Sequence, residues 1–207
     1  MEARELVVAG SYELTPSRFA DERGVIAVTH DDRELATIVG HPMFPVRQCT
    51  STRSVRGAVR GIHYTATPPG SAKFVYCPHG RALEFVVDLR VGSPTFGRWD
   101  SVVLDGDGAA SVFLPTGVGL AFVALEEETT IHYMLSQRFK KEREHAVSVL
   151  DPELALPLPV DMDLCFSTRD RDAPTIKQAR DAGYLPRYQT SQALEDGLYL
   201  ALPPRSD

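Results

Sequence analysis

Long apolar runs are missing from this 207-residue chain. No stretch of about eighteen apolar residues occurs, which excludes an ordinary membrane-spanning helix. The N-terminal residues 1–5 carry acids and lack the basic start, apolar run and small-residue cleavage site of a secretory signal. We therefore expect a cytoplasmic protein without a membrane partner.

Cysteine is also scarce. The three cysteines, Cys49, Cys77 and Cys165, are far apart and form no Cys-x-x-Cys pair. This argues against a zinc site or a disulfide framework and favours reduced thiols. The motifs of phosphate-binding loops and of dinucleotide-binding βαβ units are missing too, so the usual signals for nucleotide hydrolysis and nicotinamide chemistry are lacking.

The histidines are few and scattered. A metal site in a small β-barrel usually takes two histidines one residue apart on a strand, with a carboxylate and a further histidine. No two histidines of this chain have that spacing; they are His30, His41, His63, His79, His132 and His145. We therefore expect no metal and no other cofactor. A metal-binding barrel remains a competing hypothesis, which elemental analysis would detect.

Positive charge is in deficit, with 22 Lys and Arg against 28 Asp and Glu and a net charge of −6. Proteins bind nucleic-acid backbones largely through Lys and Arg, so a nucleic acid is not the expected partner. A small phosphorylated ligand remains compatible, because a few local Arg and Lys residues can hold a diphosphate on an acidic protein.

Short β-like segments, rich in Val, Ile, Phe, Tyr and Thr, recur about every ten residues over most of the chain. Gly, Pro and Asp separate them, which predicts an all-β sandwich or barrel. The turn sequence at 105–108, Asp-Gly-Asp-Gly, predicts a hairpin between its flanking strands. The expected strands are 25–29, 73–77, 83–89, 101–104, 111–114, 120–125 and 129–135.

The C-terminal part has a different character, because several prolines interrupt regular structure there. Residues 175–182 have helical composition and precede Gly183, a common helix stop. Residues 191–195 predict the start of another short helix. We expect a single domain over residues 1–207, with a core at about 15–155 and an extension at 156–207 that packs on it.

The pentapeptide at 60–64, Arg-Gly-Ile-His-Tyr, contains a candidate base. Alternate residues of a strand share a face, so Arg60, Ile62 and Tyr64 are expected to point one way. Gly61 and His63 then point the other way, into a barrel. A histidine in such a place is a usable base near neutral pH. The pentapeptide alone leaves open a structural histidine bonded to a core polar group.

Three further residues have possible chemical roles. Lys73 begins an apolar strand and can stabilise an oxyanion, although the residue by itself favours a solvated strand-end lysine. Tyr133 shares a strand face with Ile131, where a hydroxyl can donate a proton to a carbanion, or the ring can simply fill the core. Asp170 lies in the charged run 167–172, where a carboxylate can fix a histidine tautomer or belong to an exposed loop.

Several longer stretches match a known pattern in order and spacing, from about residue 15 to residue 175. They resemble the dTDP-4-dehydrorhamnose 3,5-epimerase family, and the Ser-Pro-Thr-Phe-Gly-x-Trp run is the most specific of them. The chain is most similar to epimerases of antibiotic deoxysugar pathways, such as the 3-epimerase of the epivancosamine route. The matching stretches are 19–24, 60–64, 67–70, 73–76, 87–99, 114–117, 133–136, 150–152 and 167–170.

The resemblance implies a cupin-type jelly roll, a homodimer without metal, and epimerisation of a dTDP-4-keto-6-deoxyhexose at C3, C5 or both. It implies that His63 is the catalytic base and that Asp170 is its partner. Lys73 would stabilise the enolate oxygen, and Tyr133 would donate a proton to the opposite face. The implied substrate-binding positions are Phe19, Arg23, Gln48, Arg60, Glu84, Leu120, Phe139 and Arg169.

Four positions depart from the family pattern. Leu120 stands where a histidine is common, and Phe139 stands where many members have a second tyrosine. Val28 replaces a common glutamate, and Glu84 replaces a strand aspartate. A leucine cannot hydrogen-bond a sugar or phosphate oxygen. These changes predict a less polar site that suits a sugar with fewer hydroxyls, and they leave open which centre is inverted.

Two other functions remain compatible with these residues. A sugar-nucleotide ketoisomerase on the same kind of barrel would move the carbonyl, which product NMR would reveal. A catalytically impaired dTDP-sugar-binding protein, suggested by Leu120, would bind dTDP without introducing solvent deuterium into the sugar.

Overall fold

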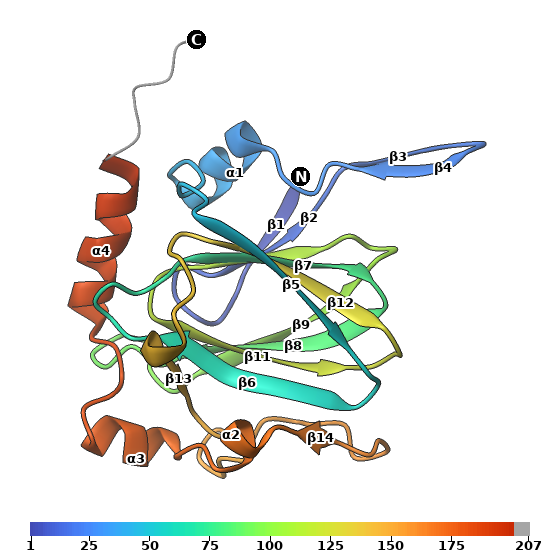
Figure 1. The fold of residues 1–207 in the computed structure, drawn as a ribbon. Coiled ribbons are helices and arrows are strands. Elements are labelled where there is room, and N and C mark those ends of the chain that lie inside the picture. Colours follow the sequence, from blue (N-terminus) through green and yellow to red (C-terminus); the bar gives the residue numbers. More distant parts are fainter. Residues whose placement is uncertain (201–207) are drawn as a thin grey trace.

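Two antiparallel β-sheets form the body of the protein and pack face to face (Figure 1). The computed structural model describes residues 1–200. The first sheet contains β1 (Glu2–Glu5), β2 (Tyr12–Thr15), β5 (Gln48–Ser54), β7 (Lys73–His79), β10 (Ser111–Leu114) and β12 (Thr129–Leu135). The second contains β6 (Ala58–Thr65), β8 (Arg81–Asp88), β9 (Trp99–Asp105), β11 (Val118–Ala124), β13 (Glu144–Ala146) and β14 (Cys165–Phe166).

The strand order is β1-β2-β10-β7-β12-β5 in the first sheet and β13-β6-β11-β8-β9 in the second, with β14 parallel to β6. A separate hairpin, β3 (Arg18–Asp21) with β4 (Gly24–Ala27), projects from the body. The helices are α1 (Asp32–Val39), the 3-10 turn η1 (Lys141–Arg143), α2 (Thr168–Arg171), α3 (Ile176–Asp181) and α4 (Tyr188–Leu200). The predicted mainly β sandwich with short C-terminal helices is confirmed.

The prediction of a hairpin at 105–108 is wrong, because the strands on either side of this turn do not pair with each other. β9 lies at the edge of the second sheet, whereas β10 pairs with β2 and β7 in the first. The turn therefore carries the chain from one sheet to the other. A turn sequence specifies that the chain reverses locally, but the apolar faces of the flanking strands decide with which neighbours they pair.

Three apolar clusters hold the layers together. One lies between the sheets and combines residues such as Val75 and Ile131 of the first sheet with Val86 and Phe122 of the second. Another covers the outer face of the first sheet, where α1 and the segment after it pack against residues such as Phe74. The third covers the outer face of the second sheet.

The segment after β13 supplies this third cover. Leu154, Ile176 and Leu185 pack against Ile62 and Tyr64 of β6, and α2 and α3 lie along this side of the molecule (Figure 1). The last seven residues of the extension predicted at 156–207 lie outside the described residues. Within residues 1–200, no helix is long and apolar enough to cross a membrane.

The helix predicted at 175–182 is confirmed. α3 begins with a capping box formed by Thr175 and Gln178, and Gly183 follows it in the left-handed region, with a φ of 73°. The short helix predicted at 191–195 lies in the right place but is longer than expected, because α4 begins at Tyr188 and runs for 13 residues.

Strand β6 contains a bulge that the alternation pattern did not reveal. Leu120 of β11 pairs with His63, and Phe122 pairs with Arg60, so three steps on β6 match two steps on β11. Ile62 and Tyr64 face the outer cluster as predicted. The expectation that Arg60 shares their face is wrong, because the extra residue turns Arg60 to the same side as His63.

Gly61 makes this bulge possible. Its φ is 119°, a value that residues with a side chain rarely adopt. A Cβ at this position would lie 2.4 Å from the carbonyl oxygen of Leu120 and 2.6 Å from the Cα of Ala121. Since both are backbone atoms of the neighbouring strand, they cannot move aside without opening the sheet.

We expect Gly61→Ala to lower the free energy of unfolding by about 1–3 kcal/mol, because the added methyl group meets fixed backbone and the φ is unfavourable. Gly197→Ala is the matched control, since nothing lies within 4 Å of a Cβ there and Gly197 is inside α4. The control should be neutral or slightly stabilising. Urea denaturation of both variants tests this, and equal stabilities would contradict it.

Candidate functional site

A cavity of about 370 Å³ opens between the two sheets. Residues of β6 and β11 form one wall, and residues of β5, β7 and β12 form the other. Segments after β12 and α2 complete the rim. Its lining residues are Arg60, His63, Thr65, Leu120 and Phe122 on one side; Gln48, Thr50, Thr52, Lys73, Tyr133 and Leu135 on the other; and Ser71, Gln137, Arg138, Phe139, Glu144 and Arg169.

His63 and Asp170 form a hydrogen-bonded pair at this cavity. His63 Nε2 lies 2.6 Å from Asp170 Oδ1, and the Asp170 side chain is 4% exposed. Burial alone would raise the pKa of Asp170, but hydrogen bonds from His63, Ser167 and the Gly61 backbone hold it below its usual value. An ionised carboxylate only accepts, so Nε2 carries the proton and Nδ1 is free to take one.

The local fold brings this pair together across 107 positions of sequence. Strand alternation in β6 points His63 into the cavity, away from the outer face that Ile62 and Tyr64 cover. Asp170 lies in α2, whose first turn is capped by the Ser167 side chain. α2 is held against the second sheet by the parallel pairing of β14 with β6 just before it. Packing of the C-terminal segment therefore positions Asp170.

Lys73 lies at the start of β7 and is 7% exposed. Burial lowers the pKa of its ammonium group, while the carboxylates of Glu144 and Glu84 act in the opposite direction, and the net shift is downward. An amino group in a site with little water exerts a strong field on charge that develops nearby. Lys73 is thus placed to stabilise an oxyanion inside the cavity.

Tyr133 lies on β12, in the sheet opposite to the one that carries His63. Burial raises the pKa of its phenol, so the hydroxyl stays protonated at neutral pH. Ile131, two residues earlier, faces the core between the sheets, as the strand alternation predicted. His132 and Tyr76, which are hydrogen-bonded to each other, lie on the other face of the first sheet. The cavity therefore has a base on one wall and an acid on the other.

Glu84 lies beside the cavity without lining it. The side chain is fully buried on β8, directly opposite Phe122 of β11. Among the described residues, neither carboxyl oxygen has a hydrogen-bond partner. Burial raises its pKa to about 8, against the opposing effect of Lys73. Burial therefore favours the protonated form of this carboxyl group near neutral pH, and Glu84, predicted as a substrate-binding residue, is absent from the cavity lining.

Five of the predicted substrate-binding residues line the cavity: Gln48, Arg60, Leu120, Phe139 and Arg169. Gln48 accepts a hydrogen bond from the backbone amide of Phe139 at 3.0 Å and donates one to Thr50. Arg60 Nε donates to Ser54 Oγ at 3.1 Å. Arg169 donates to the backbone carbonyl of Glu144. Leu120 also lines the cavity, at 6% exposure.

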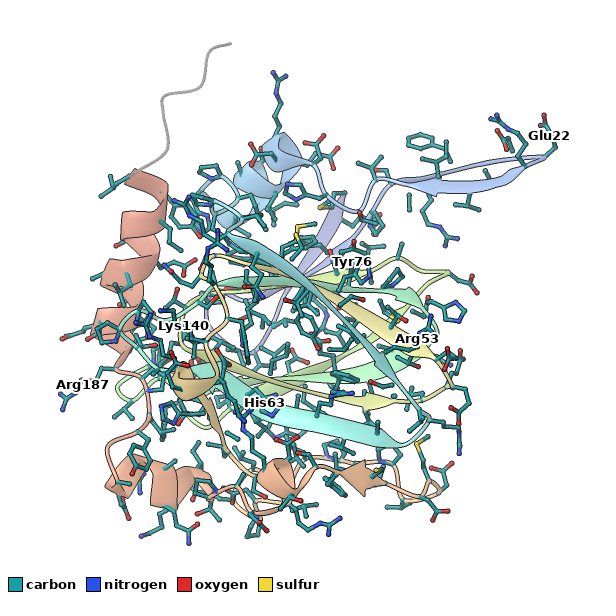
Figure 2. The ribbon with its side chains drawn as sticks, viewed as in Figure 1. Glu22, Arg53, His63, Tyr76, Lys140 and Arg187 are labelled. Atoms are coloured by element: carbon teal, nitrogen blue, oxygen red, sulfur yellow. The ribbon has the colours of Figure 1, made fainter. Side chains whose placement is uncertain are left out.

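Phe19 and Arg23 do not reach this cavity within one chain. Both belong to the projecting β3–β4 hairpin, whose tip carries Glu22, far from His63 (Figure 2). Phe19 is 62% exposed, and Arg23 pairs with Asp21 on the same hairpin. Two of the predicted substrate-binding residues are therefore separated from the rest by the geometry of the single chain.

Sequence reasoning missed several residues that line the cavity, and Glu144 is the most informative. Its carboxylate accepts a hydrogen bond from Thr65 Oγ1 at 2.6 Å. Its negative charge also acts to raise the pKa of Lys73. Glu144 belongs to a charged run at 140–145 that looks like an exposed loop. Only the pairing of β13 with the end of β6 turns it inward.

The run that is most specific to the family lies outside the cavity. Within 87–99, the buried Asp88 carboxylate accepts hydrogen bonds from Arg90, Ser93 and Thr95. Trp99 Nε1 donates to the carbonyl of Leu154 at 2.8 Å and ties β9 to the C-terminal segment. This run therefore stabilises the fold around the site. In residues 1–200, no group of three or more His, Cys, Asp or Glu side chains is arranged to hold a metal ion.

We expect Glu84→Gln to stabilise the protein increasingly as the pH rises from about 4.5 to about 8. Over that range the folded wild type keeps a proton that the unfolded chain has lost, so wild-type stability falls with pH. The difference should grow by at most about 1.4 kcal/mol per pH unit and level off above pH 8.

Urea denaturation across this pH range measures the effect, with the exposed Glu127→Gln as control. Parallel curves for Glu84→Gln and wild type would contradict a buried neutral carboxyl group.

Comparisons with known proteins agree on one family. The family model described as dTDP-4-dehydrorhamnose 3,5-epimerase matches residues 5–178. A dTDP-4-dehydrorhamnose 3-epimerase from Streptomyces niveus is 43% identical over 194 residues, covering 94% of this chain and 93% of its own length. A dTDP-4-dehydro-6-deoxyglucose 3-epimerase from Streptomyces bikiniensis is 41% identical, covering 90% and 95%.

Solved structures show the same relationship. The rmlC epimerase of Mycobacterium tuberculosis superposes with a TM-score of 0.91 at 38% identity, covering 96% of this chain and all of that one. NovW, a 4-keto-6-deoxy sugar epimerase from the novobiocin gene cluster of Streptomyces spheroides, has a TM-score of 0.88 at 43% identity, covering 93% and 96%. The chain belongs to the dTDP-4-dehydrorhamnose 3,5-epimerase family of cupin fold and is a dTDP-4-dehydro-6-deoxyhexose 3- or 3,5-epimerase.

Proposed function

We propose that His63 removes the proton next to the C4 ketone and that Tyr133 returns a proton to the opposite face of the ring. The observation that carries this proposal is the placement of the two groups on opposing sheets across one cavity. A sugar ring held between them presents one face to each. Inversion of a carbon centre requires this two-sided arrangement.

The first step transfers the proton from carbon to His63 Nδ1. The electron pair of the broken C–H bond delocalises onto the C4 oxygen, where Lys73 stabilises the negative charge. Such stabilisation lowers the barrier because the charge is larger in the transition state than in the substrate. Asp170 holds His63 in the correct tautomer and stabilises the imidazolium.

The second step transfers the phenolic proton of Tyr133 to the same carbon from the other side. The raised pKa of Tyr133 keeps this proton in place until the enolate forms. Both groups then return to their starting states by exchange with solvent. Substrate and product have the same oxidation state, so the reaction needs no redox cofactor.

We also propose that dTDP binds at the rim, where Arg60, Arg169 and Gln48 offer donors to the diphosphate and nucleotide. The similarity to Streptomyces epimerases, including NovW, supports a role in deoxysugar biosynthesis for antibiotics. A homodimer would bring Phe19 and Arg23 of one chain to the cavity of the other. The exposed apolar residues of the hairpin, Phe19, Val25 and Ile26, support such a contact.

Deuterium exchange in D₂O tests the proton-transfer roles. His63→Asn should slow both exchange and epimerisation by about 10²–10⁴-fold, since it removes the base. Tyr133→Phe should slow product formation similarly while exchange into recovered substrate continues, because His63 still removes and returns a proton on its own side. The exposed His79→Asn is the control and should match wild type.

Product NMR separates the alternatives in the same experiment. A carbonyl that has moved from C4 would indicate a ketoisomerase. Binding of dTDP with no deuterium at C3 or C5 in wild type would indicate a binding protein, and either result would overturn the proposed mechanism.

The dimer has its own test. Replacing Phe19 and Ile26, which lie opposite each other on the hairpin, by serine should shift the protein from dimer to monomer in light scattering, because it removes apolar contact area. Val160→Ser is the matched control, since Val160 is fully exposed away from the hairpin.

Mixed subunits then test whether the hairpin serves the partner's cavity. An equal mixture of Arg23→Ala and His63→Asn chains should recover roughly a quarter of wild-type activity, since half the dimers are mixed and each has one intact site. No recovery after verified subunit exchange would show that Arg23 does not act across the dimer.

A further inference from the structure

The mouth of the cavity carries a run of positive charge on a protein that is acidic overall. Residues 138–143 read Arg-Phe-Lys-Lys-Glu-Arg, so cations outnumber the single acid by four to one. The chain as a whole has a net charge of −6. The four cations are called the basic rim here, and they are Arg138, Lys140, Lys141 and Arg143.

The side chains of the basic rim are available to a ligand. All four are exposed, and none of them forms a salt bridge within residues 1–200. Four like charges so close in sequence repel one another, so they do not stabilise the fold. A ligand of opposite charge would remove this repulsion.

The backbone of this segment is fixed against the cavity mouth at both ends. The amide of Phe139, which lines the cavity, donates to Gln48 Oε1 at 3.0 Å. The carbonyl of Arg143 accepts a hydrogen bond from the amide of Ala66 at 2.7 Å, just beyond the end of β6. The basic rim is therefore held in place beside the cavity.

The inference drawn from this cluster rests on the proposed function, in which a dTDP-linked sugar enters the cavity. Its diphosphate is the anion that the basic rim would meet. Arg60 and Arg169 line the cavity and would contact the bound diphosphate, whereas Lys140, Lys141 and Arg143 are not part of the lining. Charges outside the lining act on the ligand through their longer-range field as it approaches.

We propose that the basic rim captures the diphosphate of the incoming sugar nucleotide and guides it into the cavity. An acidic protein repels an anionic ligand over much of its surface, whereas a cluster of cations beside a cleft focuses the field there and raises association rates by about 10- to 10³-fold. Salt screens such fields over about 10 Å at 0.1 M ionic strength. The attraction is therefore strongest at low salt.

Binding of dTDP, measured by isothermal titration calorimetry over a range of NaCl concentrations, tests this role. Lys140→Gln/Lys141→Gln removes two charges and should weaken binding about 5- to 10-fold near ~20 mM salt. At about 500 mM salt the difference from wild type should shrink to less than about twofold, because the charges are screened. A loss caused by altered folding would persist at high salt.

Two control variants separate charge at the mouth from charge in general. Lys140→Arg/Lys141→Arg keeps both charges and should bind dTDP as wild type does. Arg56→Gln/Arg81→Gln removes the same charge from exposed residues in the β5–β6 turn and at the start of β8, and should change binding less than about twofold at any salt concentration. In Figure 2, Arg53 near the end of β5 lies on the opposite side of the body from Lys140.

Equal losses in the two charge-removing variants would show that net charge governs binding, and they would overturn the role of the basic rim. A loss that is the same at low and high salt would also contradict it, as would unchanged binding in Lys140→Gln/Lys141→Gln. Absence of dTDP binding to wild type at every salt concentration would instead overturn the proposed nucleotide site, and this inference with it.

Discussion

The close approach of Gly61 to β11 is the constraint on which the site depends. Gly61 has no side chain, so its Cα can approach the backbone of Leu120 and Ala121 closely. This close approach allows β6 to pair with β11 with one extra residue. That bulge turns Arg60 into the same cavity as His63. It also leaves Ile62 and Tyr64 on the outer face, where they anchor the C-terminal segment.

The same packing completes the pair formed by His63 and Asp170. The segment that covers Ile62 and Tyr64 continues through β14 into α2, and α2 carries Asp170 to within 2.6 Å of His63. The position of Asp170 in the site therefore depends on the packing of this outer layer. The specific run at 87–99 supports this layer from the other end, since Trp99 is bonded to the carbonyl of Leu154.

Polar and apolar groups are divided unequally between the cavity walls. Lys73 and Tyr133 are buried, and burial shifts the pKa of each toward its neutral form. Glu84, buried beside Phe122 on the neighbouring strand, is shifted toward its neutral form in the same way. Burial removes water from this part of the cavity and strengthens the polar interactions that remain, which suits chemistry that creates a transient enolate.

The sequence by itself determined the mainly β class, the helix at 175–182 and the opposite orientation of His63 and Ile62, because these follow from local periodicity and capping. Its resemblance to a family also singled out His63, Lys73 and Tyr133 at the cavity, although Phe19, Arg23 and Glu84 do not line it within one chain. Tertiary structure alone decided that the turn at 105–108 crosses between sheets, that Arg60 joins His63, that Glu144 turns inward and that Glu84 is fully buried. These features depend on contacts between distant strands, since local alternation does not encode a bulge, a partner strand or the water that burial removes.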